Sequence, residues 1–520
     1  MEEARDRIAK VLPDVEDLRS LGGTAGVSIG VLHNGEVVAK HFLGHRDVEA
    51  NKPSNASTLY VLGSLTKMFV CSTCAQLVED GTLQWDAPIS RYIPEFKPKE
   101  DPEIGERLYL SDLLAHLTGL ARKDSLWLGA ENKILVDKEH LVDVCNDLTS
   151  VSKPRESWLY NNLMYALVGQ VIERTTKHPW GSVLEERVLK PIGMLSTTVK
   201  SSELETDAIA HPYMVGEDGN LFRMNDIAML DDNALSPAGG IRSNIDDMLK
   251  WAKELVDTSH GSSPKLANLD KILSAHAILE RKSGFDELYT LGLAKVTTPA
   301  TFGKMGFNVT LLDKMPLIGE ESQSELVFYH NGALPGYNHC FMMVPRTKTA
   351  IVVLTNSLSR GDTADWIAQV LLQAVMGFTP SIKMTESARQ AANVWKGKYD
   401  TMKKNLDEKR VSDTPEPAHK DLFGTYHHST GALKLEVFEI DQTLKFRING
   451  LDSQLHTLLH YNYDTFSFMP SAEERNKRGM IQYAMDSWLI QFQRDAGGTI
   501  VSLKWNLDKD VPDGDLFEKM

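Results

Sequence analysis

The chain has 520 residues, of which 42% are hydrophobic, 24% charged and 8% aromatic, the balance of a soluble globular protein. Its 56 Lys and Arg and 71 Asp and Glu give a formal net charge of −15, which argues against binding to nucleic acid or to a membrane surface. No run of about 18 apolar residues could span a bilayer, and the first residues lack the basic and apolar regions of a secretory signal. We therefore expect a soluble, cytoplasmic protein.

Helical and strand-like patterns alternate along the first part of the chain. Apolar residues at helical spacing predict an amphipathic helix over 3–20, and Asn34-Gly35 between two β-prone runs predicts a hairpin. A helical block is expected over 64–80 and is followed by Gly81, a residue that commonly ends a helix. Further helical patterns cover 111–117, 139–149, 163–176, 180–190, 244–256 and 264–280.

Strand patterns return later, at 326–330, 340–344 and 350–354, and a helix is expected over 363–376. Because strands at both ends enclose the helices, we predict one α+β catalytic domain over residues 1–378 whose sheet joins distant segments. Residues 379–420 are interpreted as a linker with a helical stretch and a proline-containing run. Over 421–520 apolar and polar residues alternate, which predicts a small C-terminal antiparallel β-barrel.

A serine and a lysine three residues apart give the first indication of chemistry. Ser64-Leu-Thr-Lys67 opens the helical block, so both side chains lie on one face of its first turn. A desolvated amine there could take the serine proton and so activate an acyl-transfer nucleophile. By themselves these residues also fit an N-capping serine followed by a solvated lysine, and only further motifs make the catalytic interpretation the better one.

Two later segments supply groups that acyl transfer needs. Tyr160 could move a proton between nucleophile and leaving group, and Asn162 could orient lysine or substrate. In the segment from His330, Gly332 would allow close backbone approach by a ligand, and the N–H of Ala333 could point at an oxyanion. The plainer alternatives are a core tyrosine with a helix-capping asparagine, and an ordinary hairpin turn.

Taken together, the Ser-x-x-Lys, Tyr-x-Asn and His-x-Gly elements resemble the three motifs of class C serine β-lactamases and of penicillin-binding-protein-like esterases and peptidases. Segments over 113–120, 191–198 and 236–248 are also similar to segments of this family, in the family's order. The resemblance extends over about 25–378. It implies a β-lactamase/transpeptidase-like α/β sandwich, in which an antiparallel sheet and a helical cluster meet at the nucleophile. The C-terminal barrel resembles the lipocalin-like domains of some family members.

The resemblance also implies a role for each motif residue. Ser64 would be acylated, Lys67 would act as the base, and Tyr160 would assist proton transfer. Asn162 would orient substrate and lysine. The backbone N–H groups of Ser64 and Ala333 would hold the oxyanion.

His330 departs from the class C pattern, which has lysine at this position. A histidine is often neutral at pH 7, whereas a permanent cation suits a substrate carboxylate. Family esterases and peptidases often carry histidine here, so we predict a role other than antibiotic resistance. His330, Gly332 and Ala333 are predicted to contribute to substrate binding, together with Asn162.

Two long irregular segments contain apolar residues that could bind substrate. Trp127 lies in the segment 121–138 and Phe302 in the segment 299–325. They favour a hydrophobic, uncharged acyl substrate, with Trp127 in the binding site. An equally supported alternative is that these residues cover the core.

No metal or cofactor is expected. The four cysteines are too few for a disulfide framework. A Cys-x-x-Cys pair lies in the middle of the helical block and has no second ligand pair at zinc spacing, so we interpret it as a buried helix face.

The sequence thus predicts a serine hydrolase that acts through an acyl-enzyme on an ester, lactone or amide of a small molecule. An acyltransferase with an alcohol or amine acceptor, as in natural-product biosynthesis (secondary metabolism), is the nearest alternative because its motifs are identical. A catalytically silent binding or scaffold protein is a second alternative, against which the intact Ser64, Lys67 and Tyr160 argue. The barrel could shape the pocket entrance or mediate self-association.

Overall fold

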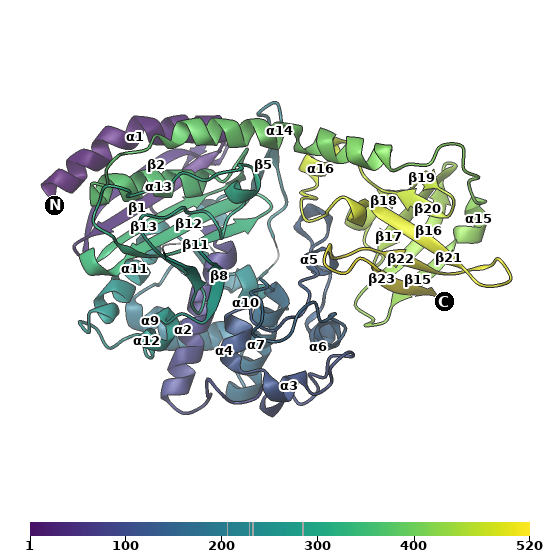
Figure 1. The fold of residues 1–520 in the computed structure, drawn as a ribbon, viewed down its shortest axis with the longest axis horizontal. Helices are drawn as coiled ribbons and strands as arrows, with labels where there is room; N and C mark the ends of the chain where they lie inside the picture. Colours follow the sequence, from purple (N-terminus) through teal and green to yellow (C-terminus); the bar gives the residue numbers. More distant parts are fainter. Residues whose placement is uncertain (205, 228, 231–232, 283–284) are drawn as a thin grey trace.

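The computed structural model describes residues 1–204, 206–227, 229–230, 233–282 and 285–520. A nine-stranded antiparallel sheet, with strand order β3-β2-β1-β13-β12-β11-β10-β9-β8, lies at the centre of the larger body in Figure 1. Its strands are β1 (Gly26–His33), β2 (Glu36–Asp47), β3 (Lys52–Pro53), β8 (Ala277–Glu280), β9 (Glu287–Tyr289), β10 (Ala294–Thr297), β11 (Leu326–Leu334), β12 (Tyr337–Val344) and β13 (Thr349–Thr355). Strand β1 pairs with β13, from Val27 opposite Thr355 to Leu32 opposite Ala350. The sheet therefore joins distant segments, as the sequence predicts.

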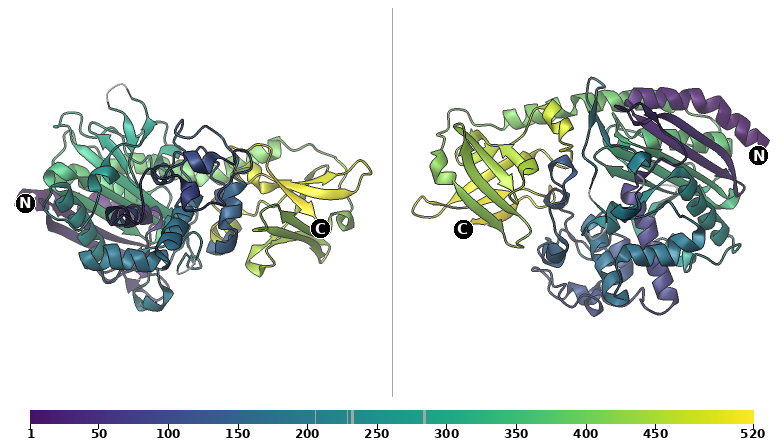
Figure 2. Two further views of the ribbon diagram at one scale, coloured as in Figure 1. Left: turned by 90° about the horizontal axis from the view of Figure 1, so that it is seen from below. Right: turned by 180° about the vertical axis from the view of Figure 1, so that it is seen from behind.

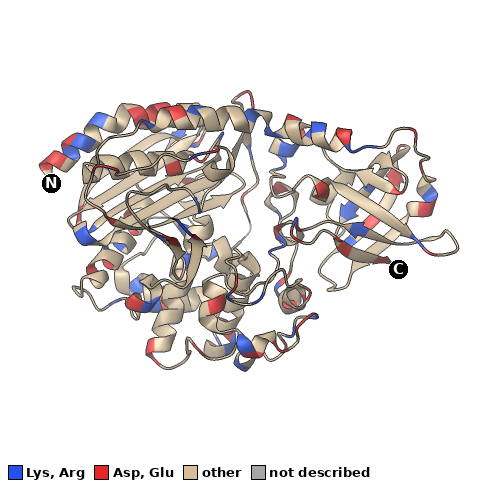
Figure 3. Cartoon of the chain, viewed as in Figure 1, with Lys and Arg blue, Asp and Glu red and all other residues tan. Residues whose placement is uncertain are grey.

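Helices cover both faces of the sheet centre, where β1, β12 and β13 are buried at almost every position. Helix α1 (Glu2–Gly22) packs on α13 (Thr363–Met376) and on α14 (Met384–Glu408), and α13 packs on β12 and β13. Helix α11 (Ile245–Ser259) contacts β1 and β13. Lys, Arg, Asp and Glu mark α1 and α14 along the outside, while the sheet strands beneath them are largely free of charge (Figure 3).

A helical cluster forms the second layer. Helix α2 (Thr66–Glu79) runs through it and is buried along most of its length, including Cys71 and Cys74, as predicted. Around α2 lie α4 (Leu110–Leu114), α7 (Asn162–Thr176), α8 (Trp180–Leu184) and α10 (Ser236–Gly239). The other short elements of this part are α3 (Ile104–Arg107), α5 (Asp124–Trp127), α6 (Leu141–Asn146), α9 (Lys190–Ile192), α12 (Leu269–Leu273), β4 (Tyr60–Val61), β5 (Tyr213–Val215), β6 (Leu221–Arg223), β7 (Arg242–Ser243) and β14 (Ser357–Leu358).

The helix predicted over 264–280 is wrong. Only α12 is helical in this stretch, and Ala277–Glu280 form β8, the edge strand of the sheet. Ala277 pairs with Tyr289 of β9. Pairing with a neighbouring strand has overridden the local helical pattern, as tertiary contacts often do in short segments.

The C-terminal part is a second nine-stranded sheet, in the order β18-β17-β16-β15-β23-β22-β21-β20-β19. Its strands are β15 (Gly424–His428), β16 (Lys434–Ile440), β17 (Thr443–Ile448), β18 (Leu455–Thr457), β19 (Leu459–Asn462), β20 (Thr465–Ser467), β21 (Leu489–Arg494), β22 (Ile500–Trp505) and β23 (Asp515–Lys519). The two edge strands, β18 and β19, are separated by Leu458 alone, so the antiparallel sheet curls into a nearly closed barrel. The predicted barrel is thereby confirmed.

Helix α14 joins the two parts. It begins on α1 at the sheet and extends to the barrel, as both Figure 1 and the rear view in Figure 2 show. At the barrel, the hydroxyl of Tyr399 in α14 donates a 2.5 Å hydrogen bond to the carbonyl of Pro470. The helical stretch expected in the linker segment 379–420 is therefore α14, which packs against both parts of the chain. Within the described part of the chain, no helix is both long and apolar enough to cross a membrane.

Candidate active site

The nucleophile turn, residues Gly63–Leu65, lies where the sheet and the helical cluster meet. Gly63 has φ +54°, a conformation that glycine adopts without strain, and the short 3-10 turn Gly63–Leu65 leads directly into α2. Ser64 is partly exposed on this turn. The imidazole of His339 on β12 donates a 2.7 Å hydrogen bond to the carbonyl of Val61, which fixes the chain just before the turn. Sequence reasoning gave His339 no role.

Lys67 is buried directly beside Ser64. Its Nζ lies 3.1 Å from Ser64 Oγ and donates to Asn162 Oδ1 at 2.8 Å and to the Ala238 carbonyl at 2.9 Å. Burial lowers the pKa of Lys67 from 10.5 to about 7, although the negative charge of Asp124 opposes the shift. A substantial fraction of the amine is then neutral at physiological pH and able to accept a proton.

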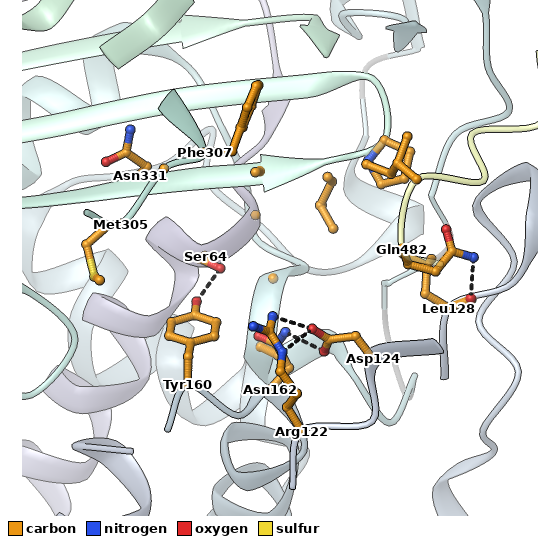
Figure 4. A pocket seen from close by; sticks show the side chains of 18 of the residues that line it. Ser64, Arg122, Asp124, Leu128, Tyr160, Asn162, Met305, Phe307, Asn331 and Gln482 are labelled. Carbon is orange, nitrogen blue, oxygen red and sulfur yellow. Dashed lines mark hydrogen bonds and ion pairs between the residues drawn. The ribbon is translucent and has the colours of Figure 1, made fainter. Parts of the chain in front are cut away.

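Tyr160 contacts the nucleophile from the side opposite the sheet. It lies just before α7, and its hydroxyl donates a 2.6 Å hydrogen bond to Ser64 Oγ (Figure 4). Lys67 Nζ is 4.9 Å from the centre of the Tyr160 ring. Burial raises the pKa of the Tyr160 phenol, so this group is a neutral hydrogen-bond donor at pH 7. The structure thus brings Ser64, Lys67, Tyr160 and Asn162 together, as the sequence predicts.

Strand β11 presses its backbone against the nucleophile turn. A Cβ added at Gly332 would lie 2.3 Å from the Leu62 carbonyl oxygen, and one added at Gly63 would lie 3.1 Å from Ala333 N. The close approach that Gly332 allows is therefore to the chain's own nucleophile turn rather than to a ligand. It brings the Ala333 backbone to the turn that carries Ser64.

His330 does not line the cavity, in contrast to the expected substrate contact. Its side chain is 1% exposed and lies beside Tyr160, with ring centroids 6.2 Å apart. Nδ1 donates to the Asn331 carbonyl at 2.6 Å, and Nε2 is 3.2 Å from the Tyr289 hydroxyl. Burial, together with the charge of Lys67, lowers the pKa of His330 to about 3, so the ring is neutral. Strand alternation turns this side chain into the core behind the tyrosine.

A cavity of about 440 Å³ opens in front of Ser64. Trp127 lines it, as predicted, and so do Met305 and Phe307 of the second irregular segment (Figure 4). Phe302 does not line it, because its ring is buried against Tyr329 at a centroid distance of 5.5 Å. Trp127, Met305 and Phe307 therefore face the cavity, whereas Phe302 covers the core, and acyl binding by this wall stays a prediction.

Sequence reasoning missed three charged residues of the cavity wall, Arg122, Asp124 and Lys304. Arg122 and Asp124 form an ion pair, and the guanidinium lies 5.9 Å from the centre of the Tyr160 ring. Asp124 Oδ1 accepts hydrogen bonds from Asn162 Nδ2 at 3.1 Å and from Trp127 Nε1 at 3.0 Å. The segment has no motif-like spacing, so only its position in space reveals it.

The barrel also contributes to the wall of the cavity. Ile481 and Gln482, between β20 and β21, line it together with Ala238 and Gly239 of α10. Gln482 Nε2 donates to the Leu128 carbonyl at 2.8 Å (Figure 4). Sequence patterns do not predict this contribution, because it depends on how two distant segments pack.

The fold and the arrangement of the site are those of serine enzymes of the β-lactamase and penicillin-binding-protein type. The family model described as Beta-lactamase matches residues 14–374, and the chain belongs to this family. A second model, described as a domain of unknown function (DUF3471), matches residues 408–518.

Curated relatives and a solved structure are consistent with this assignment. "Protein flp" of Staphylococcus aureus (strain MW2) is 22% identical over 338 residues, which is 64% of this chain and 60% of that protein. "Unguisins hydrolase ungD'" of Aspergillus campestris is 22% identical over 307 residues, 58% of this chain and 53% of that protein. The chain thus spans at most about 60% of the length of these relatives. An octameric penicillin-binding protein homologue from Pyrococcus abyssi shares the fold over 98% of this chain and 100% of its own, with a TM-score of 0.59 and 19% identity.

The fit of β11 against the nucleophile turn can be tested with Gly332→Ala. The added methyl group would clash with the Leu62 carbonyl and displace the turn. We expect the rate at which a fluorophosphonate probe labels the protein to fall at least about tenfold, since small misplacements of reacting groups are costly. Gly397→Ala is the control, because nothing lies within 4 Å of a Cβ at this position in α14. Equal labelling rates for Gly332→Ala and Gly397→Ala would contradict the conclusion that the fit of β11 against the nucleophile turn positions Ser64.

The pKa of Lys67 predicts the pH dependence of acylation. The neutral amine is the active form, so the labelling rate should rise about tenfold per pH unit at low pH and level off above about pH 7. The measurement is the second-order labelling rate between about pH 5 and about pH 9. Lys67→Arg, whose guanidinium keeps its proton, should be slow throughout. A rate still rising above about pH 9 would show that burial does not lower this pKa.

Proposed function

We propose that this protein is a serine hydrolase that acts on an ester, lactone or amide of a small molecule through a covalent acyl-enzyme on Ser64. The observation that carries the proposal is the position of Ser64 Oγ, which is 3.1 Å from the Lys67 amine and 2.6 Å from the Tyr160 hydroxyl. A nucleophile with a base and a proton donor in contact is the arrangement that acyl transfer needs. The similarity to the relative described as an unguisins hydrolase supports hydrolysis.

The proposed reaction has two halves. Ser64 Oγ attacks the substrate carbonyl carbon while its proton passes to the neutral Lys67 amine, and the N–H groups of Ser64 and Ala333 stabilise the oxyanion. Tyr160 then donates its proton to the leaving alcohol or amine and regains one from Lys67 as the carbon–leaving-group bond breaks. In the second half, water attacks the carbonyl carbon of the acyl-enzyme and gives a proton to the Lys67 amine. The bond from that carbon to Ser64 Oγ then breaks, Oγ takes the proton back, and the acid is released.

The lining of the cavity supports the proposal that the acyl group of the substrate is largely apolar. Trp127, Leu128, Met305 and Phe307 are among the apolar residues of its wall, and their side chains offer few groups for a polar substrate. Arg122 and Lys304 supply positive charge at the wall, but Asp124 pairs with Arg122 and Glu280 pairs with Lys304. An apolar acyl group bound beside a polar leaving group is the combination that this wall suits.

Two alternatives stay predictions. An acyltransferase would use the same first half and replace water by an alcohol or amine. A catalytically silent scaffold is less well supported, because the catalytic residues are not only retained but in contact. Cytoplasmic location also stays a prediction. Self-association does as well, with the octameric Pyrococcus abyssi homologue as its support.

The nucleophile assignment is tested by intact-mass analysis after treatment with a fluorophosphonate. Wild type should gain one adduct, Ser64→Ala none, and Ser57→Ala, a control at an exposed serine, one. An adduct on Ser64→Ala would overturn the nucleophile assignment, and an unlabelled wild type would overturn the enzyme proposal. Turnover of p-nitrophenyl esters, D-amino-acid amides and β-lactams should fall at least about 10³-fold in Ser64→Ala for each compound that is a substrate. Added amines that divert the acyl group would identify an acyltransferase.

The apolar wall predicts a preference for acyl length. Phe307→Ala removes a ring from the cavity, so KM for a long-chain ester should rise about tenfold more than KM for the acetyl ester. Phe302→Leu is the matched control in the same segment, since its ring lies in the core. Steady-state kinetics on a series of p-nitrophenyl esters gives the ratio. The same ratio in wild type and Phe307→Ala would exclude this wall from acyl binding.

A further inference from the structure

The segment Arg122–Asp124 lies between the catalytic residues and the barrel, and both sides hold it. On the catalytic side, Asp124 Oδ1 accepts the 3.1 Å hydrogen bond from Asn162 Nδ2. Asn162 Oδ1 in turn accepts from Lys67 Nζ at 2.8 Å, and Nζ is 3.1 Å from Ser64 Oγ. A continuous chain of side chains therefore links this segment to the nucleophile.

On the barrel side, two aspartates bind the same segment. Asp508 Oδ2, after β22, accepts the backbone N–H groups of Arg122 at 2.9 Å and of Lys123 at 2.8 Å. The Lys123 side chain is 2% exposed, and its Nζ lies 2.5 Å from Asp515 Oδ1 on β23. Asp508 and Asp515 are both buried.

The backbone at Lys123 depends on these contacts. Lys123 has φ +40° and ψ +48°, a left-handed conformation that costs free energy for any residue with a Cβ. Such a residue keeps this conformation only when its surroundings hold it. Here Asp508 of the barrel binds its N–H. Its ammonium group is bound by Asp515 of the barrel, together with Asp147 of the catalytic part of the chain.

The acidic cluster around Lys123 is a contact between the barrel and the catalytic part of the chain rather than a metal site. Oxygen or nitrogen atoms of Asp147, His428 and Asp515 lie within 4.8 Å of one another, a grouping that could hold a metal ion. The ammonium group of Lys123 lies among them, 3.5 Å from Asp147 Oδ2 and 2.5 Å from Asp515 Oδ1. The lysine thus supplies the positive charge that these carboxylates require.

We propose that the C-terminal barrel positions the catalytic lysine. Asp508 and Asp515 are positioning residues: they hold the segment Arg122–Asp124, so that Asp124 can orient Asn162, and Asn162 can orient Lys67 toward Ser64. The inference rests on the proposed acylation of Ser64. It assigns the barrel a part in that reaction, beyond the lining of the cavity.

Substitutions at Asp508 test the link in the full-length protein. Asp508→Ala removes the acceptor of the Arg122 and Lys123 N–H groups, and of the Asp510 N–H within its own loop. We expect fluorophosphonate labelling of Ser64 to slow about tenfold or more. Asp508→Asn keeps one acceptor oxygen of the same shape, so most of the rate should return. Asp495→Ala is the matched control: Asp495 Oδ1 also accepts two backbone N–H groups, of Gly497 and Thr499, but within a barrel hairpin. Its labelling rate should equal that of wild type.

A double-mutant cycle separates positioning from a general loss of stability. If Asp508 acts through Asp124, Asp508→Ala should slow labelling less than about twofold in an Asp124→Ala background. If labelling of the double variant is instead slowed by the product of the two single-variant factors, the proposal is overturned. Thermal unfolding of each variant identifies those that do not fold. If Asp508→Ala is one of them, Asp515→Asn, which breaks the ion pair with Lys123, replaces it in the cycle.

The outcomes distinguish this proposal from the proposed function. A wild-type protein that does not label at Ser64 contradicts the proposed function itself. A wild-type protein that labels, together with a folded Asp508→Ala variant that labels equally fast, contradicts only the positioning role of the barrel.

Discussion

The structure depends above all on the burial of one lysine next to one serine. An ammonium group in the protein interior is costly, and Lys67 meets this cost by three hydrogen bonds from Nζ to oxygen atoms and by a lowered pKa. The same burial gives the amine the proton affinity of a base at neutral pH. The burial that makes the Lys67 ammonium group costly is therefore the same burial that enables its neutral amine to accept a proton.

Three separate parts of the chain must converge to keep this arrangement. The nucleophile turn is held by His339 beneath it and by β11, whose Gly332 leaves room for the Leu62 carbonyl. The start of α7 brings Tyr160 and Asn162 to the serine from the helical cluster. None of these contacts is local, so the surroundings of Ser64 are a property of how the sheet and helical cluster pack.

The barrel extends the same principle. In the C-terminal barrel, Asp508 accepts backbone N–H groups of a short segment that no motif marks. That segment carries Arg122 and Asp124 into the wall of the cavity, where Asp124 contacts Asn162. A domain whose strands carry none of the family motifs is thus linked, through the segment Arg122–Asp124, to Asn162, which accepts a hydrogen bond from Lys67.

The sequence by itself determined most of the elements and the candidate residues of the site. Periodicity gave the first helix, the hairpin, the late strands and the barrel, because these patterns record which faces are buried, and motif spacing gave Ser64, Lys67 and Tyr160. The sequence wrongly predicted a helix over 264–280, where strand pairing outweighed a local pattern. It also wrongly placed His330 in the cavity, although the strand turns that side chain into the core. Only the tertiary structure decided the neutral state of His330, the part of Asp124, and the contacts of the barrel. These depend on burial and on distances between residues hundreds of positions apart, and neither quantity is written in local spacing.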